Sequence, residues 1–146
     1  MLQRSRRRAI GSSLILLFAA LAPAPLQPRQ VLPTSVTTEV VAKLAKERAE
    51  FGAKAADLAW LYYSENRIDA DKVYRWSRRA WEAGRDSAKD QDERVAAAEA
   101  HLARMTKLEA KIAKIRKLGF GNSLDVAEVE YYYKEAEFLK AQAQGR

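Results

Sequence analysis

The side chains of this chain that could do chemistry are few. His101 is the one histidine among 146 residues, and there is no cysteine. A cysteine nucleophile, a thiolate metal site, a disulfide and a site with several histidine ligands are therefore excluded. A histidine-based triad would have to be built around His101, which has no serine or aspartate at a fitting spacing. We expect His101 to lie on the surface or flank of a long charged helix.

Carboxylates are more numerous, and a run near the C-terminus could be interpreted as paired acid and base groups. It contains Glu128, Glu130, Glu135 and Glu137. Lys134 and Lys140 interleave with them, which is typical of a solvated helix face with ion pairs one turn apart. The chain has no phosphate-binding loop, nucleophile elbow or metal-ligand spacing. The sequence therefore predicts no catalytic residue, no cofactor, no metal and no enzymatic activity.

The net charge of +7 first suggests a nucleic-acid partner. Residues 1–22 contain four arginines and no acidic residue; removing these four from the 26 basic residues leaves 22 against 19 acidic residues, a net charge of +3. The remaining charges of both signs are mixed along the chain instead of forming one basic stripe. The composition therefore argues against nucleic acid as a partner.

Residues 1–22 have the pattern of a secretory signal peptide. An arginine-rich start precedes a short apolar run from Leu14, with small residues at Ala20 and Ala22. The run is shorter than the about 20 residues that cross a bilayer. We expect cleavage after Ala22 or Ala24, and an uncleaved leader would be the only attachment to a membrane. Ser5-Arg6-Arg7-Arg8-Ala9-Ile10 is also similar to a twin-arginine signal, with an ordinary secretory leader as the alternative. Both point to export, to the periplasm or cell envelope of a bacterium.

All four prolines lie in residues 23–34, which predicts an extended linker. Residues 35–146 contain no proline and predict one all-α domain of long antiparallel hairpins, with three main helices and a long middle helix. Thr34 or Ser35 would cap the first helix. Its apolar residues recur at three- and four-residue steps, interrupted by Arg48, and are Val41, Leu44, Phe51, Ala55, Leu58 and Tyr62.

The middle helix is expected to run from about Asp71 to Leu118, with Asp69 or Asp71 as its cap. Glycine in a helix costs about 1 kcal/mol relative to alanine, and the stretch from Gly84 to Asp92 lacks large apolar side chains. We favour a continuous helix, with a break in this stretch as the alternative. The turn Gly119-Phe120-Gly121-Asn122-Ser123 then ends it, since glycine suits a helix C-terminus and Asn122 or Ser123 caps the next helix.

Pairing residues across the two turns predicts the hairpin contacts. At the first turn Leu58 falls opposite Trp76. At the second turn the predicted contacts join large residues to small or medium ones, as interdigitated packing requires. These residues are Leu102, Met105, Leu108, Ile112, Ile115, Val126, Val129, Tyr133, Ala136 and Leu139.

The segment from Gly119 to Leu139, with its glycine turn, Leu124-Asp125-Val126 and a helix rich in Ala and Glu, resembles the helical-hairpin repeat of TolC-like outer-membrane efflux proteins. Val73-Tyr-Arg-Trp-Ser-Arg-Arg-Ala-Trp-Glu82 is similar to uncharacterised exported helical proteins of planctomycete-type bacteria. The resemblance implies hairpin geometry and an envelope location. It does not imply transport, because the chain lacks the alternating strands of a channel barrel.

Two apolar layers enclose little core, so the remaining apolar seams should need a partner. The sequence therefore favours a non-enzymatic coiled-coil protein with a structural or protein-interaction role, acting by self-association or on a protein partner. The alternative is a small periplasmic chaperone or stress-sensing protein that binds unfolded clients.

Overall fold

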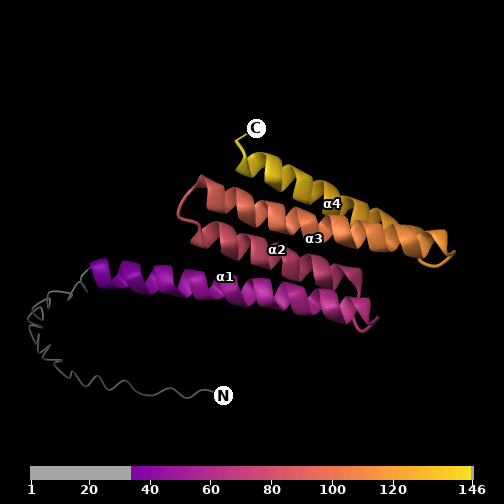
Figure 1. Cartoon of the computed structure of the whole chain (residues 1–146), viewed down its shortest axis with the longest axis horizontal. Helices are drawn as coiled ribbons and strands as arrows, with labels where there is room; N and C mark the ends of the chain where they lie inside the picture. The colour runs from indigo at the N-terminus through magenta and orange to yellow at the C-terminus, as the bar shows by residue number, and fades with distance from the viewer. Residues whose placement is uncertain (1–33, 146) are drawn as a thin grey trace, which may run out of the picture. The chain divides into compact units, whose positions relative to one another are not determined.

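The computed structural model describes residues 34–145, in which all regular structure is helical (Figure 1). The helices are α1 (Thr34–Ser64), α2 (Ala70–Ser87), α3 (Gln91–Lys117) and α4 (Ser123–Ala143). The expected all-α class is thus confirmed. The predicted signal peptide and nearly all of the predicted linker lie outside the described residues.

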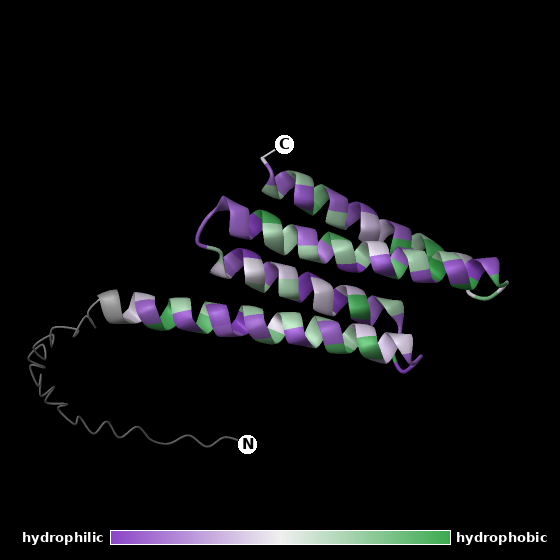
Figure 2. Ribbon diagram, in the orientation of Figure 1, coloured by the Kyte–Doolittle hydropathy of each residue, from purple (hydrophilic) through white to green (hydrophobic). Residues whose placement is uncertain are grey.

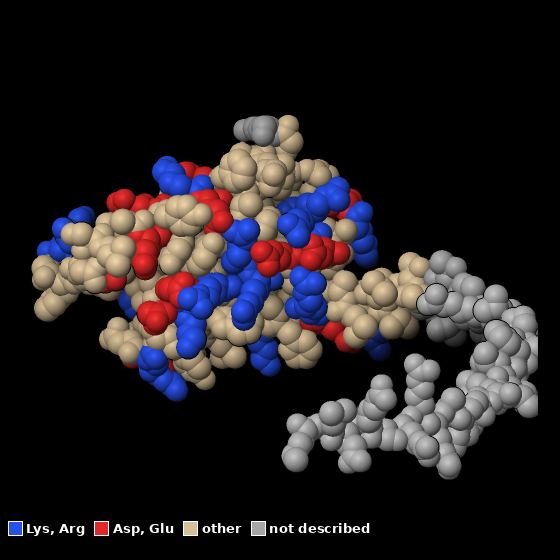
Figure 3. All heavy atoms as spheres, turned by 180° about the vertical axis from the view of Figure 1, so that it is seen from behind, with Lys and Arg blue, Asp and Glu red and all other residues tan. Residues whose placement is uncertain are grey.

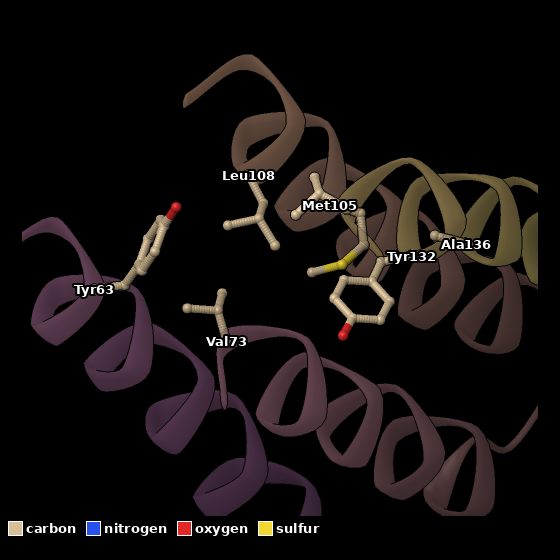
Figure 4. Close-up of a cluster of buried hydrophobic side chains, with 7 residues drawn as sticks. Tyr63, Val73, Met105, Leu108, Tyr132 and Ala136 are labelled. Atoms are coloured by element: carbon tan, nitrogen blue, oxygen red, sulfur yellow. The ribbon is translucent and has the colours of Figure 1, made fainter. Parts of the chain in front are cut away.

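Successive helices run antiparallel and each packs on the next, while α2 also contacts α4. One buried cluster draws on all four helices (Figure 4). Tyr63 of α1 and Val73 of α2 lie toward Leu108 and Met105 of α3, and α4 supplies Val129, Tyr132 and Ala136. Burying these apolar side chains removes them from water and holds the four helices together.

The favoured continuous middle helix is wrong and the alternative, a break between Gly84 and Asp92, is confirmed, because α2 ends at Ser87 and the chain reverses at residues 88–90. Ala88 adopts an extended backbone (φ −65°, ψ 132°), which ends α2. The Asp90 side chain then accepts a hydrogen bond of 2.9 Å from the Glu93 backbone N–H and caps α3, while the Glu93 carboxylate accepts one of 2.8 Å from Lys89 N–H. These side chains satisfy backbone donors that a helix start leaves free, so the reversal is stable.

Gly84 does not break the helix but lies within α2. A methyl group added at Gly84 would lie 3.0 Å from Cβ of Ala97 on α3. The glycine therefore lets α2 and α3 approach closely beside their connection.

The starts of α2 and α4 are capped by side chains as well. Asp69 caps α2, accepting from the Lys72 N–H at 2.9 Å. Asn122 caps α4 and forms a capping box with Asp125, and Ser123 is the first residue of the helix. Gly119 and Gly121 have φ of 81° and 82°, a left-handed conformation that glycine adopts without a side-chain clash.

The face of α1 that packs on α2 consists mainly of small residues. Ala56 and Ala59 are buried, and an added methyl group at Gly52 would lie 3.3 Å from the Cα of Ala80. Because these residues have little or no side chain, the two helix backbones come close together. Within residues 34–145 no helix is both long and apolar enough to cross a bilayer.

Candidate functional site

Most of the large apolar residues of α1 lie outside the core; Tyr63, which belongs to the buried cluster, is an exception. Seven residues at alternating three- and four-residue steps form what we call the outer seam. Five are large and apolar, and the other two are Arg48 and Ala55. In chain order the seam is Val41, Leu44, Arg48, Phe51, Ala55, Leu58 and Tyr62. Its five large apolar side chains are 37% to 71% exposed. Figure 2 shows hydrophobic residues recurring along α1 between hydrophilic ones. Contiguous apolar surface of this kind marks interaction sites on folded proteins.

The outer seam is separate from the face that packs on α2. The packed face (Ala45, Ala49, Gly52, Ala56, Ala59 and Tyr63) repeats at the same steps, one residue further along the chain. One residue corresponds to about 100° around a helix, so α1 carries two seams about a quarter-turn apart. The small-residue seam is covered by α2, and the large-residue seam is not.

A groove runs beside the outer seam, between α1 and α2. Phe51, Gly52 and Ala55 line it from α1, and Trp76 and Ala83 line it from α2. Its volume is about 490 Å³. The groove and the seam form one largely apolar surface that two helices hold in place.

Three charged residues, Arg48, Arg79 and Glu82, also line the groove, and Arg48 is the one that lies within the outer seam. The Arg48 guanidinium forms an ion pair of 2.9 Å with Asp86 of α2. That contact holds the charge toward α2, and hydrogen bonding to Arg85 and Arg48 lowers the pKa of Asp86. The aliphatic part of Arg48 remains available for apolar contact on the seam.

The structure places the predicted hairpin contacts in three groups. Met105, Leu108, Val129, Ala136 and Leu139 are buried. The half-buried residues are Trp76, Leu102, Ile112, Ile115, Val126 and Tyr133. Leu58 is the correction: its side chain is 44% exposed on the outer seam, because α1 packs through its small residues instead.

His101 also differs from expectation, since it is fully buried and not on a surface or flank. Nδ1 of His101 lies 2.8 Å from Oγ of Ser77, which is equally buried. Burial lowers the pKa of His101 to about 4, so the ring is neutral at pH 7. Its Nε2 has no hydrogen-bond partner among the described residues. A serine–histidine pair is the arrangement of a nucleophile and its base. Because both side chains are fully buried here, no substrate can reach this pair.

A charged network lies beside this pair. The Tyr74 hydroxyl donates a hydrogen bond of 2.6 Å to Glu135, which also pairs with Arg78. Burial and the bond to Glu135 raise the pKa of Tyr74 to about 12. Burial opposes ionisation of Glu135, but the hydrogen bonds from Tyr74 and Arg78 outweigh it and lower its pKa. The network ties α2 to α4, where the Tyr74 and Tyr132 rings stack at 3.9 Å.

The sequence contained a signal for the buried histidine. Ala98, His101, Met105, Leu108 and Ile112 follow alternating three- and four-residue steps, so His101 occupies an apolar seam position. The predicted seam has Leu102 in its place, but Leu102 is half-buried and His101 is fully buried.

Charges on the viewed face of the molecule are mixed. Figure 3 shows Lys and Arg interspersed with Asp and Glu, with no uninterrupted basic stripe on that face. Among the described residues no cluster of three or more histidine, aspartate or glutamate side chains could hold a metal ion. No protein-family model, curated protein or solved structure matches the chain.

Proposed function

We propose that this chain is a non-enzymatic helical protein that acts by binding a protein helix on the outer seam of α1. The single observation that supports it is the exposure of a heptad-spaced apolar seam next to a largely apolar groove. The helix that carries this seam is already held against α2 by its small-residue seam. Heptad-spaced apolar residues are the surface that coiled-coil partners recognise. The chain would serve a structural or interaction role in the bacterial cell envelope.

The envelope location rests on residues 1–22 and on the TolC-like resemblance of the second hairpin, both of which remain predictions. Mass spectrometry of the protein recovered from the periplasm of an expressing bacterium tests the location. We expect a mature N-terminus at Pro23 or Pro25. A full-length chain found only in the cytoplasm would contradict export.

The binding role is tested with a labelled synthetic coiled-coil peptide that has leucine at both core positions of each heptad. We expect the full chain either to associate with itself or to bind this probe, as measured by light scattering and fluorescence anisotropy. Leu58→Glu should abolish both, because it places a charge in the seam. Glu50→Gln, on an exposed position of the same helix outside the seam, is the matched control. A chain that does neither overturns the proposal.

Client binding is the second candidate, and the apolar groove beside Trp76 favours it. A holding chaperone would suppress aggregation of an unfolded test protein at near-equal molar amounts. Trp76→Ala should then weaken suppression while leaving the coiled-coil probe bound. No suppression of aggregation by the wild-type chain rules this candidate out.

A further inference from the structure

The outer seam of α1 is complementary to itself in one antiparallel register. We propose that its partner is a second copy of this chain, with the two α1 helices antiparallel and related by a twofold axis near residues 49–50. This inference rests on the proposed function, since it names the occupant of the same surface. A twofold contact uses one patch on both copies, so the patch has to match its own reversed sequence.

The core layers of such a pair are well matched. In an antiparallel coiled coil each residue at heptad position a meets a residue at position d of the partner helix. The register then joins Val41 to Leu58, Leu44 to Ala55 and Arg48 to Phe51, each pair occurring twice. The first two layers join a large residue to a small or medium one, and in the third the guanidinium would lie near an aromatic ring, which attracts cations.

The flanking positions match as well. On the side away from α2 the flank of the seam consists of Val40, Glu47, Lys54 and Leu61. In this register Glu47 lies opposite Lys54 of the second copy, and Val40 lies opposite Leu61. Val40 and Leu61 are 51% and 47% exposed in the single chain, so the pairing would cover both.

Neighbouring arrangements are disfavoured by the same residues. A shift of one heptad in either direction opposes Lys54 to Lys54 or Glu47 to Glu47, and like charges in these positions are destabilising. A parallel pair in register places two Arg48 side chains in one core layer. Charge and apolar pattern therefore select one orientation and one register.

The approach to the seam is open. The small-residue face of α1 is covered by α2, about a quarter-turn away, so α2 lies beside a second α1 and not in its path. Arg48 is drawn toward Asp86 at 2.9 Å, which neutralises the one charge in the seam. The groove lined by Phe51, Trp76 and Ala83 adjoins the contact and would be partly filled by it.

Cysteine cross-linking tests the register directly, because the chain has no cysteine of its own. Glu47→Cys and Lys54→Cys are prepared as separate full-length variants, mixed in equal amounts and oxidised. We expect the disulfide-linked species to be mainly the mixed dimer, joined between residues 47 and 54. Mainly like-with-like dimers, or no cross-link at micromolar concentration, would overturn the inference.

Charge reversal tests the same contact without a covalent bond. Glu47→Lys or Lys54→Glu alone creates two like-charge pairs per dimer and should weaken dimerisation roughly tenfold in sedimentation equilibrium. The combined Glu47→Lys/Lys54→Glu variant restores opposite charges and should recover wild-type affinity. Glu50→Lys, the same reversal outside the flank, should leave affinity unchanged. Failure of the double variant to recover overturns the proposed pairing.

The two proposals fail in different ways. A monomer that still binds the leucine-heptad probe, and loses it on Leu58→Glu, overturns the second copy as partner but leaves the seam as a binding surface. A monomer that binds no probe overturns both. Circular dichroism confirms that each variant is folded, which we expect because the substituted side chains lie outside the buried core.

Discussion

The hydroxyl oxygen of Ser77 lies 2.8 Å from Nδ1 of His101, and both residues are fully buried where α2 packs on α3. A buried polar pair of this kind stabilises a fold only while both groups stay neutral and bonded to each other. The pair joins two helices that lie on opposite sides of the reversal at residues 88–90. It therefore fixes how α2 and α3 align.

Acid should destabilise the fold through His101. Its pKa is about 4 in the folded chain, against an ordinary value of 6.5, so only the unfolded chain takes up a proton between these values. The free energy of unfolding should therefore fall as pH drops below about 6.5, by up to about 3 kcal/mol near pH 4. Urea unfolding at several pH values measures this loss.

His101→Gln separates this effect from other acid effects, because glutamine can still bond to Ser77 but does not titrate. Glu135, whose pKa is lowered, loses its stabilising charge in both proteins as the pH falls further. We expect the variant to lose less stability than the wild type over the window from about pH 6.5 to pH 4. Equal losses would show that His101 is not the group responsible.

Tyr74→Phe should destabilise the contact between α2 and α4. The substitution removes the 2.6 Å hydrogen bond to Glu135 but keeps the ring stacked on Tyr132. Hydrogen bonds to charged groups contribute roughly 1.5–3 kcal/mol, so thermal unfolding should shift downward accordingly. Tyr131→Phe is the matched control, because Tyr131 is 62% exposed. We expect the thermal unfolding midpoint of this variant to equal that of the wild type within experimental error. A similar shift in both variants would argue against the network.

Gly84→Ala should be destabilising even though alanine favours helices. The added methyl group would lie 3.0 Å from Cβ of Ala97, and neither can move without moving a helix backbone. We expect a cost of roughly 1 kcal/mol in chemical denaturation, the excess of overlap over the gain in helix propensity. The double variant Gly84→Ala/Ala97→Gly tests the cause. It should be more stable than the sum of the two single changes predicts, and strict additivity would contradict the close approach.

Asp90→Ala should weaken the start of α3. The carboxylate accepts the Glu93 N–H at 2.9 Å, and loss of such a cap costs about 1 kcal/mol. Asp92→Ala removes the same charge two residues later, within the helix. It should lower the free energy of unfolding by only about a few tenths of a kcal/mol. Equal effects in thermal unfolding would show that the charge near the helix start matters more than the cap.

The helical class and the turn before α4 could be anticipated because the signals are local. Proline-free sequence from Thr34 onward, the glycines at 119 and 121 and the cap at Asn122 each act within a few residues. The reversal at residues 88–90 also had a local signal, Asp90 three residues before Glu93. The continuous helix favoured from the sequence overlooks this signal, while Gly84 itself is tolerated inside α2 and serves helix packing.

The choice of buried face on α1 could not be obtained from periodicity. Both seams have heptad spacing, and hydrophobicity favours the one with Phe51 and Leu58. The structure buries the one with Gly52 and Ala56, because small residues bring α1 and α2 close together. Which seam meets α2 depends on the complementary shape of α2, which is tertiary information. The same choice leaves the candidate interaction surface exposed.

The reversal at residues 88–90 also bears on the speed of folding. Because α1 contacts α2, α2 contacts α3 and α3 contacts α4, most helix–helix contacts join segments adjacent along the chain. Such topologies need little loop closure before contacts form, and helical proteins of this type fold in microseconds to milliseconds. A single unbroken middle helix would have had to pair with partners along its whole length. The short turn instead lets the chain assemble one hairpin after another in the order of its sequence.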